Sequence, residues 1–137
     1  MDDLMASASL AVAGMKAQAK RLRVISQNMA NADSLAKTRG GDPYRRQVIS
    51  FRQALDRAMG AKKPVADKVM PDQSQFGQKY EPSHPMADAA GYVKTPNVNM
   101  LVEIMDMREA ELSYQANTAA LMTSRSMAAQ TLDLLNN

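Results

Sequence analysis

The sequence predicts a mainly α protein: two long terminal helices paired as an antiparallel coiled coil, with a small, partly β or irregular segment protruding between them. Residues 97–137 contain no Pro or Gly. About 40 residues without a helix breaker can form a helix of some 60 Å, at roughly 1.5 Å per residue. Five of the six prolines instead fall within residues 60–96, where they favour turns and extended chain. We therefore assign residues 1–33 and 97–137 to one helical core domain and residues 34–96 to the protruding segment.

The N-terminal helix is predicted from a heptad pattern. Small or apolar side chains recur at alternating spacings of four and three residues, with one polar interruption: Leu4, Ala8, Ala11, Met15, Gln18, Leu22, Ile25 and Met29. This spacing is typical of the a and d positions of a coiled coil, which face a partner helix. Gly14 costs about 1 kcal/mol relative to Ala within a helix, which is too little to end the helix there.

The C-terminal helix is expected to begin just after Pro96, with Asn97 or Asn99 capping its free amide groups. It carries two apolar flanks. The first consists of Ile104, Met107, Tyr114, Leu121, Ala128, Leu132 and Leu135, and the second of Val98, Leu101, Met105, Leu112, Ala119, Met122 and Ala129. Because a helix packed on a single core needs only one apolar stripe, we expect another protein molecule to cover the second flank.

The charge distribution is asymmetric and suits an antiparallel pair of helices. Residues 1–60 carry ten Lys and Arg against five Asp and Glu, whereas residues 96–137 carry two against five. If residue 29 lies opposite residue 100, Arg23 falls near Asp106 and Lys20 falls near Glu109. Exposed pairs of this kind contribute about 0–1 kcal/mol each, so they would set the register of the pair more than its stability.

The middle of the chain is predicted to contain short strands and turns. The best strand candidate is Tyr44–Phe51, because aromatic and β-branched residues surround a polar stretch. Gln53–Met59 would continue this strand or form a short helical turn. Val65–Met70 and Phe76–Tyr80 are further short strand candidates, and Tyr80–Val93 is expected to be extended with turns.

The sequence offers few groups for catalysis or metal binding. It has no Cys and a single His, His84, so neither a disulfide nor a multi-histidine metal site can form. We expect His84 to fix the Pro-rich segment by hydrogen bonding. Gly40-Gly41 lacks the spacing of a phosphate-binding loop, and Arg45-Arg46 is a weak signal for nucleic acid. We therefore predict a protein that is not an enzyme and takes no cofactor, metal, nucleic acid or small-molecule substrate.

Several stretches resemble the bacterial flagellar rod and hook proteins. Residues 28–34 (NMANADS), followed by residues 43–47 (PYRRQ), are similar to the signature after the first helix of that family. Residues 80–93, with the PNVN of residues 96–99, resemble the proximal rod members in particular. Residues 113–117 (SYQAN) resemble the motif of the C-terminal helix. The resemblance covers nearly the whole chain.

The resemblance implies a structural subunit of the flagellar basal body. Its terminal helices would pack side by side into a hollow rod, a drive shaft that crosses the periplasm and passes torque from the membrane ring to the hook. The implied partners are other copies of the chain, related rod proteins, membrane-ring and rod-junction proteins, and the flagellar type III export apparatus. Export without a cleaved signal peptide agrees with the acidic start at Met1-Asp2-Asp3 and with the lack of an apolar run of membrane-spanning length.

We predict two sets of contact residues for such a subunit. The coiled coil within one chain would use Met15, Leu22, Ile25, Leu112 and Leu121. The interface between subunits would use Asn28, Asn31, Tyr44, Arg45, Arg46, His84 and Tyr114. Uncovered helix flanks would keep the free chain loose enough to pass a narrow export channel, and assembly would then bury them at about 25 cal/mol per Å² of apolar area.

Two alternatives share part of this evidence. A helical adaptor or filament subunit of another secretion system predicts the same two helices, but it does not account for residues 80–93. A small basic nucleic-acid binder would show salt-sensitive DNA binding, and the acidic C-terminal helix argues against it.

Overall fold

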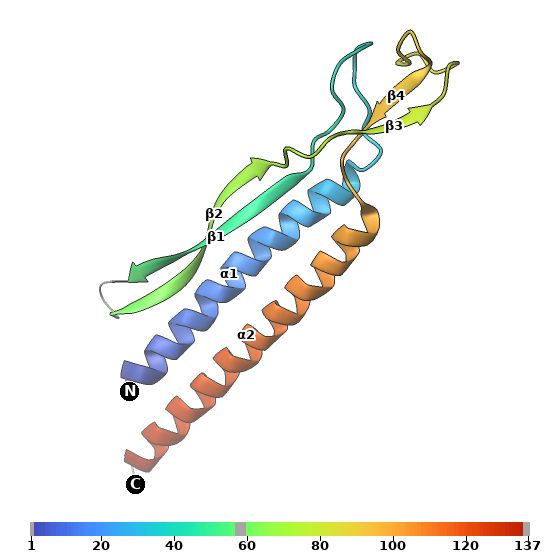
Figure 1. The fold of residues 1–137 in the computed structure, drawn as a ribbon. Coiled ribbons are helices and arrows are strands. Elements are labelled where there is room, and N and C mark those ends of the chain that lie inside the picture. Colours follow the sequence, from blue (N-terminus) through green and yellow to red (C-terminus); the bar gives the residue numbers. More distant parts are fainter. Residues whose placement is uncertain (1, 57–59, 136–137) are drawn as a thin grey trace. The chain divides into compact units, whose positions relative to one another are not determined.

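The computed structural model describes residues 2–56 and 60–135. Within these residues the chain forms two helices and two small sheets (Figure 1). In chain order the elements are α1 (Asp2–Ala30), β1 (Gln47–Asp56), β2 (Ala61–Pro71), β3 (Gly77–Tyr80), β4 (Tyr92–Thr95) and α2 (Met100–Leu135). The prediction of two long terminal helices with a partly β middle is confirmed.

The described residues belong to two compact units. We call residues 1–22, 50–68 and 108–137 the terminal unit, and residues 23–49 and 69–107 the middle unit. Each unit therefore contains part of both helices. The predicted division between a helical core domain (residues 1–33 and 97–137) and a protruding segment (residues 34–96) stays a prediction.

The start of α2 shows how the two candidate caps divide their roles. The Asn99 side-chain oxygen accepts hydrogen bonds from the backbone N–H of Leu101 (3.0 Å) and of Val102 (3.4 Å). It thereby satisfies amides that have no partner within the helix. Asn97 does not cap the helix, because its side-chain oxygen accepts instead from the backbone N–H of Arg46 at 2.7 Å.

In the terminal unit, small and polar side chains lie where α1 faces α2. The Ser7 and Ser124 hydroxyls are 3.1 Å apart. At Gly14 an added Cβ would lie 2.7 Å from the side-chain oxygen of Asn117, so the two backbones approach closely there. Ala11, Ala17, Ala110 and Ser124 are buried. As positions rise along α1, the positions of their partners on α2 fall.

The predicted pairing of Lys20 with Glu109 was wrong, and that of Arg23 with Asp106 stays a prediction. Arg21, not Lys20, pairs with Glu109, at 3.1 Å. Lys20 donates to the backbone carbonyls of Ala66 (3.4 Å) and Asp67 (3.2 Å) on β2. The prediction assumed that residue 29 lies opposite residue 100. The close contacts of the small side chains select a different register, in which the charged side chains meet other partners.

The two strands β1 and β2 form one sheet. The Ser50 hydroxyl lies 3.4 Å from both the backbone N and O of Lys68, and Lys63 pairs with Asp56 at 2.6 Å, as in an antiparallel hairpin. The strand predicted from Tyr44 to Phe51 begins at Gln47 and continues to Asp56. The rest of the predicted Gln53–Met59 segment, residues 57–59, lies outside the described residues.

The second sheet pairs β3 with β4 in antiparallel register, with Gly77 opposite Thr95 and Tyr80 opposite Tyr92. The Tyr80 and Tyr92 rings meet edge to face, with centroids 5.2 Å apart. The predicted strands at Val65–Met70 and Phe76–Tyr80 correspond to β2 and β3. The strand β4 was not predicted; it has only four residues and depends on its pairing with β3.

Candidate functional site

The middle unit contains a cluster of hydrogen-bonded polar side chains, which we call the polar cluster. Its members come from the end of α1, the segment that leads into β1 and the first residue of β1, the segment after β2, and the region before and at the start of α2: Asn28, Tyr44, Arg46, Gln47, Asp72, Asn97, Glu103 and Asp106. Asn28 and Glu103 are 1% and 0% exposed. A buried amide or carboxylate is costly unless partners satisfy it, so this cluster depends on correct geometry.

Asn28 is bonded through both ends of its amide. Its nitrogen donates to the Gln47 carbonyl at 2.8 Å and to a Glu103 carboxylate oxygen at 3.1 Å. Its oxygen accepts from the Tyr44 hydroxyl at 2.9 Å and from the Gln47 backbone N–H at 2.8 Å. An asparagine amide can donate two hydrogen bonds and accept two, so the full hydrogen-bonding capacity of Asn28 is used. One side chain thus joins α1, β1 and α2.

Arg46 holds three carboxylates at once. Its Nε donates to Glu103 at 2.5 Å, and its two terminal nitrogens lie 3.2 Å from Asp106 and 3.4 Å from Asp72. Burial lowers the pKa of the Arg46 guanidinium, but the hydrogen bond and charge of Glu103, with those of Asp72 and Asp106, outweigh it and leave the pKa raised. The planar guanidinium suits such multiple contacts better than a lysine ammonium would.

Two further members of the cluster have perturbed acidities. Burial, followed by the negative charge of Glu103, raises the pKa of the Tyr44 hydroxyl. The backbone N–H of Ser74 donates to Asp72 at 2.9 Å. This hydrogen bond lowers the pKa of Asp72, with burial opposing it and Arg46 assisting it. At neutral pH the tyrosine therefore remains a hydrogen-bond donor and the aspartate an anion.

The predicted interface residues fall into two groups. Asn28, Tyr44 and Arg46 come together in the polar cluster. The neighbouring Arg45 donates to the carbonyls of Asp72 (2.9 Å) and Ser74 (3.1 Å), and its guanidinium lies 4.1 Å from the centre of the Phe76 ring.

The other three predicted interface residues lie apart from the cluster. Asn31 donates to the Gln27 carbonyl at the end of α1, at 2.8 Å. The His84 ring accepts from the backbone N–H of Met86 at 3.1 Å, which agrees with its expected role in fixing this segment. Tyr114 is partly buried on the α2 part of the terminal unit.

The residues predicted for the coiled coil differ in burial. Ile25 is buried, with 4% exposed, and Met15, Leu22 and Leu121 are partly buried. Leu112 is 66% exposed, so the side of α2 on which it lies is not covered by the described chain.

The second predicted flank of α2 is exposed. We call its four most exposed members the outer flank: Leu101, Met105, Leu112 and Met122, which are 65–67% exposed. Members of the first flank, such as Met107, Tyr114 and Leu121, are partly buried. Apolar side chains gathered on one side of a helix and left uncovered typically mark a surface for another protein.

Glu103 was not among the residues predicted to be functional. A signal was nevertheless present. Glu103, Ala110, Asn117 and Ser124 are seven residues apart, and all are buried or partly buried. This repeat would have placed Glu103 on the covered side. Nothing in the local sequence marks Asp72 as a partner of Arg46.

Residues 2–56 and 60–135 contain neither a candidate metal site nor a candidate membrane-spanning helix. These residues hold no group of three or more His, Cys, Asp or Glu side chains placed to bind a metal ion. No helix among them is both long and apolar enough to span a membrane.

Comparison with known proteins relates the chain to one family. Residues 89–134 match the model of the flagellar basal body rod FlgEFG protein C-terminal family. Flagellar basal-body rod protein FlgC from Agrobacterium fabrum is 44% identical over 98% of this chain and 97% of its own length. The Salmonella typhimurium protein of the same name is 41% identical, over 91% and 92% of the two chains. The Bacillus subtilis protein is 32% identical, over 93% and 95%.

The helices, the uncovered outer flank and these relatives define a structural protein of the flagellar basal-body rod, which assembles with other rod proteins and is not an enzyme. Within that class, the chain belongs to the FlgC family.

Proposed function

We propose that this subunit polymerises through its terminal helices into a hollow drive shaft, which transmits torque from the membrane ring to the hook across the periplasm. The observation that carries the proposal is the outer flank of α2, with four large apolar side chains about two-thirds exposed. At about 25 cal/mol per Å² of apolar area, covering this flank is a substantial driving force for assembly. Other copies, related rod proteins and membrane-ring or rod-junction proteins are the proposed partners.

The two helices of the subunit form an antiparallel coiled coil in this proposal. Contacts to α2 occur at Ser7, Gly14 and Arg21 of α1, at intervals of seven residues. A seven-residue contact repeat is the mark of helices that supercoil around each other. The division into a helical core domain (residues 1–33 and 97–137) and a protruding segment (residues 34–96) rests on the same pairing.

The polar cluster has a mechanical role in this proposal. The hydrogen bonds of Asn28, Tyr44 and Arg46 are made within the chain. We therefore assign these residues to holding α1, β1 and α2 together rather than to contacting a neighbouring subunit directly. A shaft that transmits torque needs its subunits to resist distortion. Arg45, Asn31, His84 and Tyr114 remain proposed interface residues.

We also propose that the free chain is loosely ordered, since its outer flank is uncovered, and that the type III apparatus exports it without a cleaved signal peptide. Circular dichroism of the purified full chain in dilute solution tests the first part. We expect weak, non-cooperative melting. Fully formed helices that melt cooperatively in the monomer would overturn it.

Charged residues on the outer flank should prevent assembly. The double variant Met105→Glu and Leu112→Glu places two carboxylates where apolar surface is to be buried, and burying an unpaired charge is strongly unfavourable. We expect loss of swimming and of rods in the native host, with normal cellular levels of the protein. The matched control is Gln27→Glu, an exposed position on α1 outside the outer flank, which should swim normally. Normal rods in the double variant would contradict the proposal.

The close contact at Gly14 gives a test of the helix pair. Gly14→Ala gains about 1 kcal/mol in helix propensity, but its Cβ would meet Asn117, whose side chain is held by a 2.8 Å hydrogen bond to the Ser113 carbonyl. We expect Gly14→Ala alone to lower the urea concentration that releases the subunit from isolated basal bodies. The double variant Gly14→Ala with Asn117→Ala should need a higher urea concentration for release than Asn117→Ala alone. Equal effects in both backgrounds would show that the helices do not pair here.

A further inference from the structure

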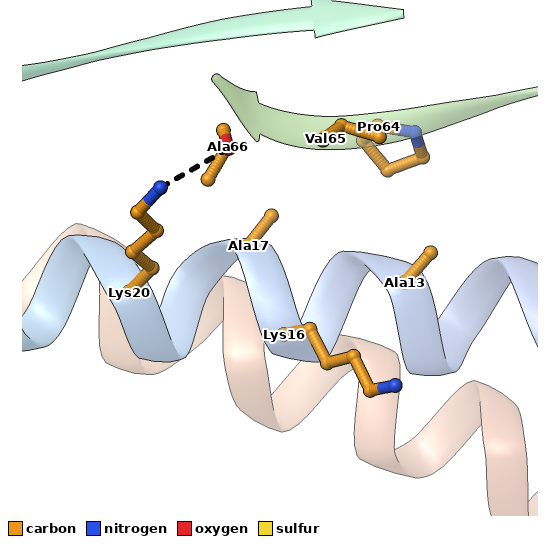
Figure 2. Close-up of a pocket in the computed structure, with 7 residues that line it drawn as sticks. All are labelled: Ala13, Lys16, Ala17, Lys20, Pro64, Val65 and Ala66. Atoms are coloured by element: carbon orange, nitrogen blue, oxygen red, sulfur yellow. Dashed lines mark hydrogen bonds between the residues drawn. The ribbon is translucent and has the colours of Figure 1, made fainter. Parts of the chain in front are cut away.

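The terminal unit has a groove between α1 and β2, which is separate from the outer flank on α2. The groove has a volume of about 240 Å³ and is lined by Ala13, Lys16, Ala17, Lys20, Pro64, Val65 and Ala66. Figure 2 shows the small side chains of Ala13 and Ala17 directed from α1 toward β2, with Pro64 and Val65 opposite them. Since a water molecule occupies about 30 Å³ in the liquid, the space is large enough for one or two bulky apolar side chains.

The groove combines an apolar floor with positive charge at its edge. Lys20 donates to the Ala66 carbonyl (Figure 2) and to the Asp67 carbonyl, and so ties α1 to β2. Lys16 is exposed, and among the described residues it makes no hydrogen bond or ion pair. A complementary occupant would therefore carry a large apolar side chain with a carboxylate beside it.

The same unit carries such a pair on α2. Leu112 is 66% exposed, and Glu109 is one helical turn before it, so both lie on one side of the helix. The Glu109 side chain is also 66% exposed, and its ion pair among the described residues is the exposed contact with Arg21, at 3.1 Å. Exposed contacts of this kind are weak, so Glu109 is able to engage a second cation.

We propose that the groove between α1 and β2 receives Leu112 of a second copy of this chain, with Glu109 of that copy meeting Lys16. The inference rests on the proposed assembly of subunits and names one contact within it. The groove and the Leu112–Glu109 side of α2 are different surfaces of one molecule, so the contact between two copies is heterologous. A heterologous contact that does not close on itself generates a helical filament, which is the symmetry that a rod requires. The basic first part and the acidic last part of the chain favour the same pairing.

Disulfide cross-linking between copies tests the contact, because the natural chain has no cysteine. Two differently tagged full-length copies, one with Val65→Cys and one with Leu112→Cys, are produced together in the native host lacking its own gene, and treated with a mild oxidant. We expect a cross-linked dimer that carries both tags. The matched control replaces Leu112→Cys by Leu134→Cys, an exposed apolar position about 33 Å further along α2 at 1.5 Å per residue. It should give at least tenfold less dimer.

Charge exchange gives an independent readout. Lys16→Glu should reduce the doubly tagged dimer severalfold, and adding Glu109→Lys to the same chains should restore it. A dimer yield that is indifferent to both changes would overturn the assigned pairing.

A swimming assay of the same strains distinguishes failure of the groove contact from failure of the proposed function. If the cysteine strains swim but yield no doubly tagged dimer, the groove contact is wrong and the proposed rod function stands. A cross-link from Val65→Cys to a different protein would also overturn the choice of a second copy. If the natural chain, restored to the same host, does not support swimming, the proposed function itself fails.

Discussion

Replacing Arg46 by Met is expected to destabilise the middle unit by about 3–5 kcal/mol, because removing one partner of a buried ion pair leaves the other charge uncompensated. The charge in question is Glu103, which is completely buried and bonded to Arg46. Asp72 and Asp106 would lose the same cation. We expect non-motile cells and subunits that leave isolated basal bodies at a much lower urea concentration.

Two companion variants make this result interpretable. Arg45→Met removes the adjacent arginine, which bonds to backbone carbonyls and stacks on Phe76 but neutralises no buried carboxylate, so its effect should be clearly smaller. Arg46→Met combined with Glu103→Leu removes the buried pair together, and most of the stability should return. If Arg46→Met behaves like Arg45→Met, Glu103 does not depend on Arg46.

Asn28→Asp is the second change expected to have a large effect, although it alters the side-chain volume very little. The carboxylate cannot donate the hydrogen bonds to the Gln47 carbonyl and to Glu103, and it places a second negative charge beside the buried Glu103. Each buried group left unsatisfied costs about 1–3 kcal/mol, so we expect a total loss of roughly 3 kcal/mol or more. The urea concentration that releases the subunit measures this loss, as does the yield of intact rods.

Asn31→Asp is the matched control for this change. It makes the same chemical substitution three residues later, where the side chain is only partly buried and bonds to the Gln27 carbonyl at a helix end. A negative charge near a helix C-terminus costs about 0.3–1 kcal/mol, so a modest effect is expected. Similar losses for both variants would mean that the burial of Asn28 is not important.

Such a cluster suits the proposed export of the subunit before it is assembled. Its stabilising contacts join segments distant in the sequence, since Asn28 and Glu103 are 75 residues apart. Unfolding separates all of these partners together, which leaves no strong local structure to obstruct passage. Once the segments meet again, the hydrogen bonds admit few alternative arrangements.

Several residues of the polar cluster could be predicted from the sequence, but the hydrogen bonds that join them could not. Asn28, Tyr44 and Arg46 were predicted as functional residues because they lie in motifs that resemble the rod family. The sequence analysis assigned them to contacts between subunits, whereas the structure joins them to one another and to Glu103. Glu103 was not predicted as a functional residue, since a carboxylate early in a helix is commonly explained by the helix dipole.

The sequence by itself determined the two terminal helices, the cap region after Pro96 and the strands β1 and β2, because these depend on residues that are close along the chain. Its composition also predicted a strand at β3, although β3 pairs with β4. It also determined that α2 has more apolar surface than one partner helix can cover. Only the tertiary structure decided that Asn99 rather than Asn97 caps α2, that Arg21 rather than Lys20 meets Glu109, and that β4 forms. Each of these outcomes depends on the fit of side chains from distant segments, such as Gly14 against Asn117, and local sequence patterns do not encode that fit.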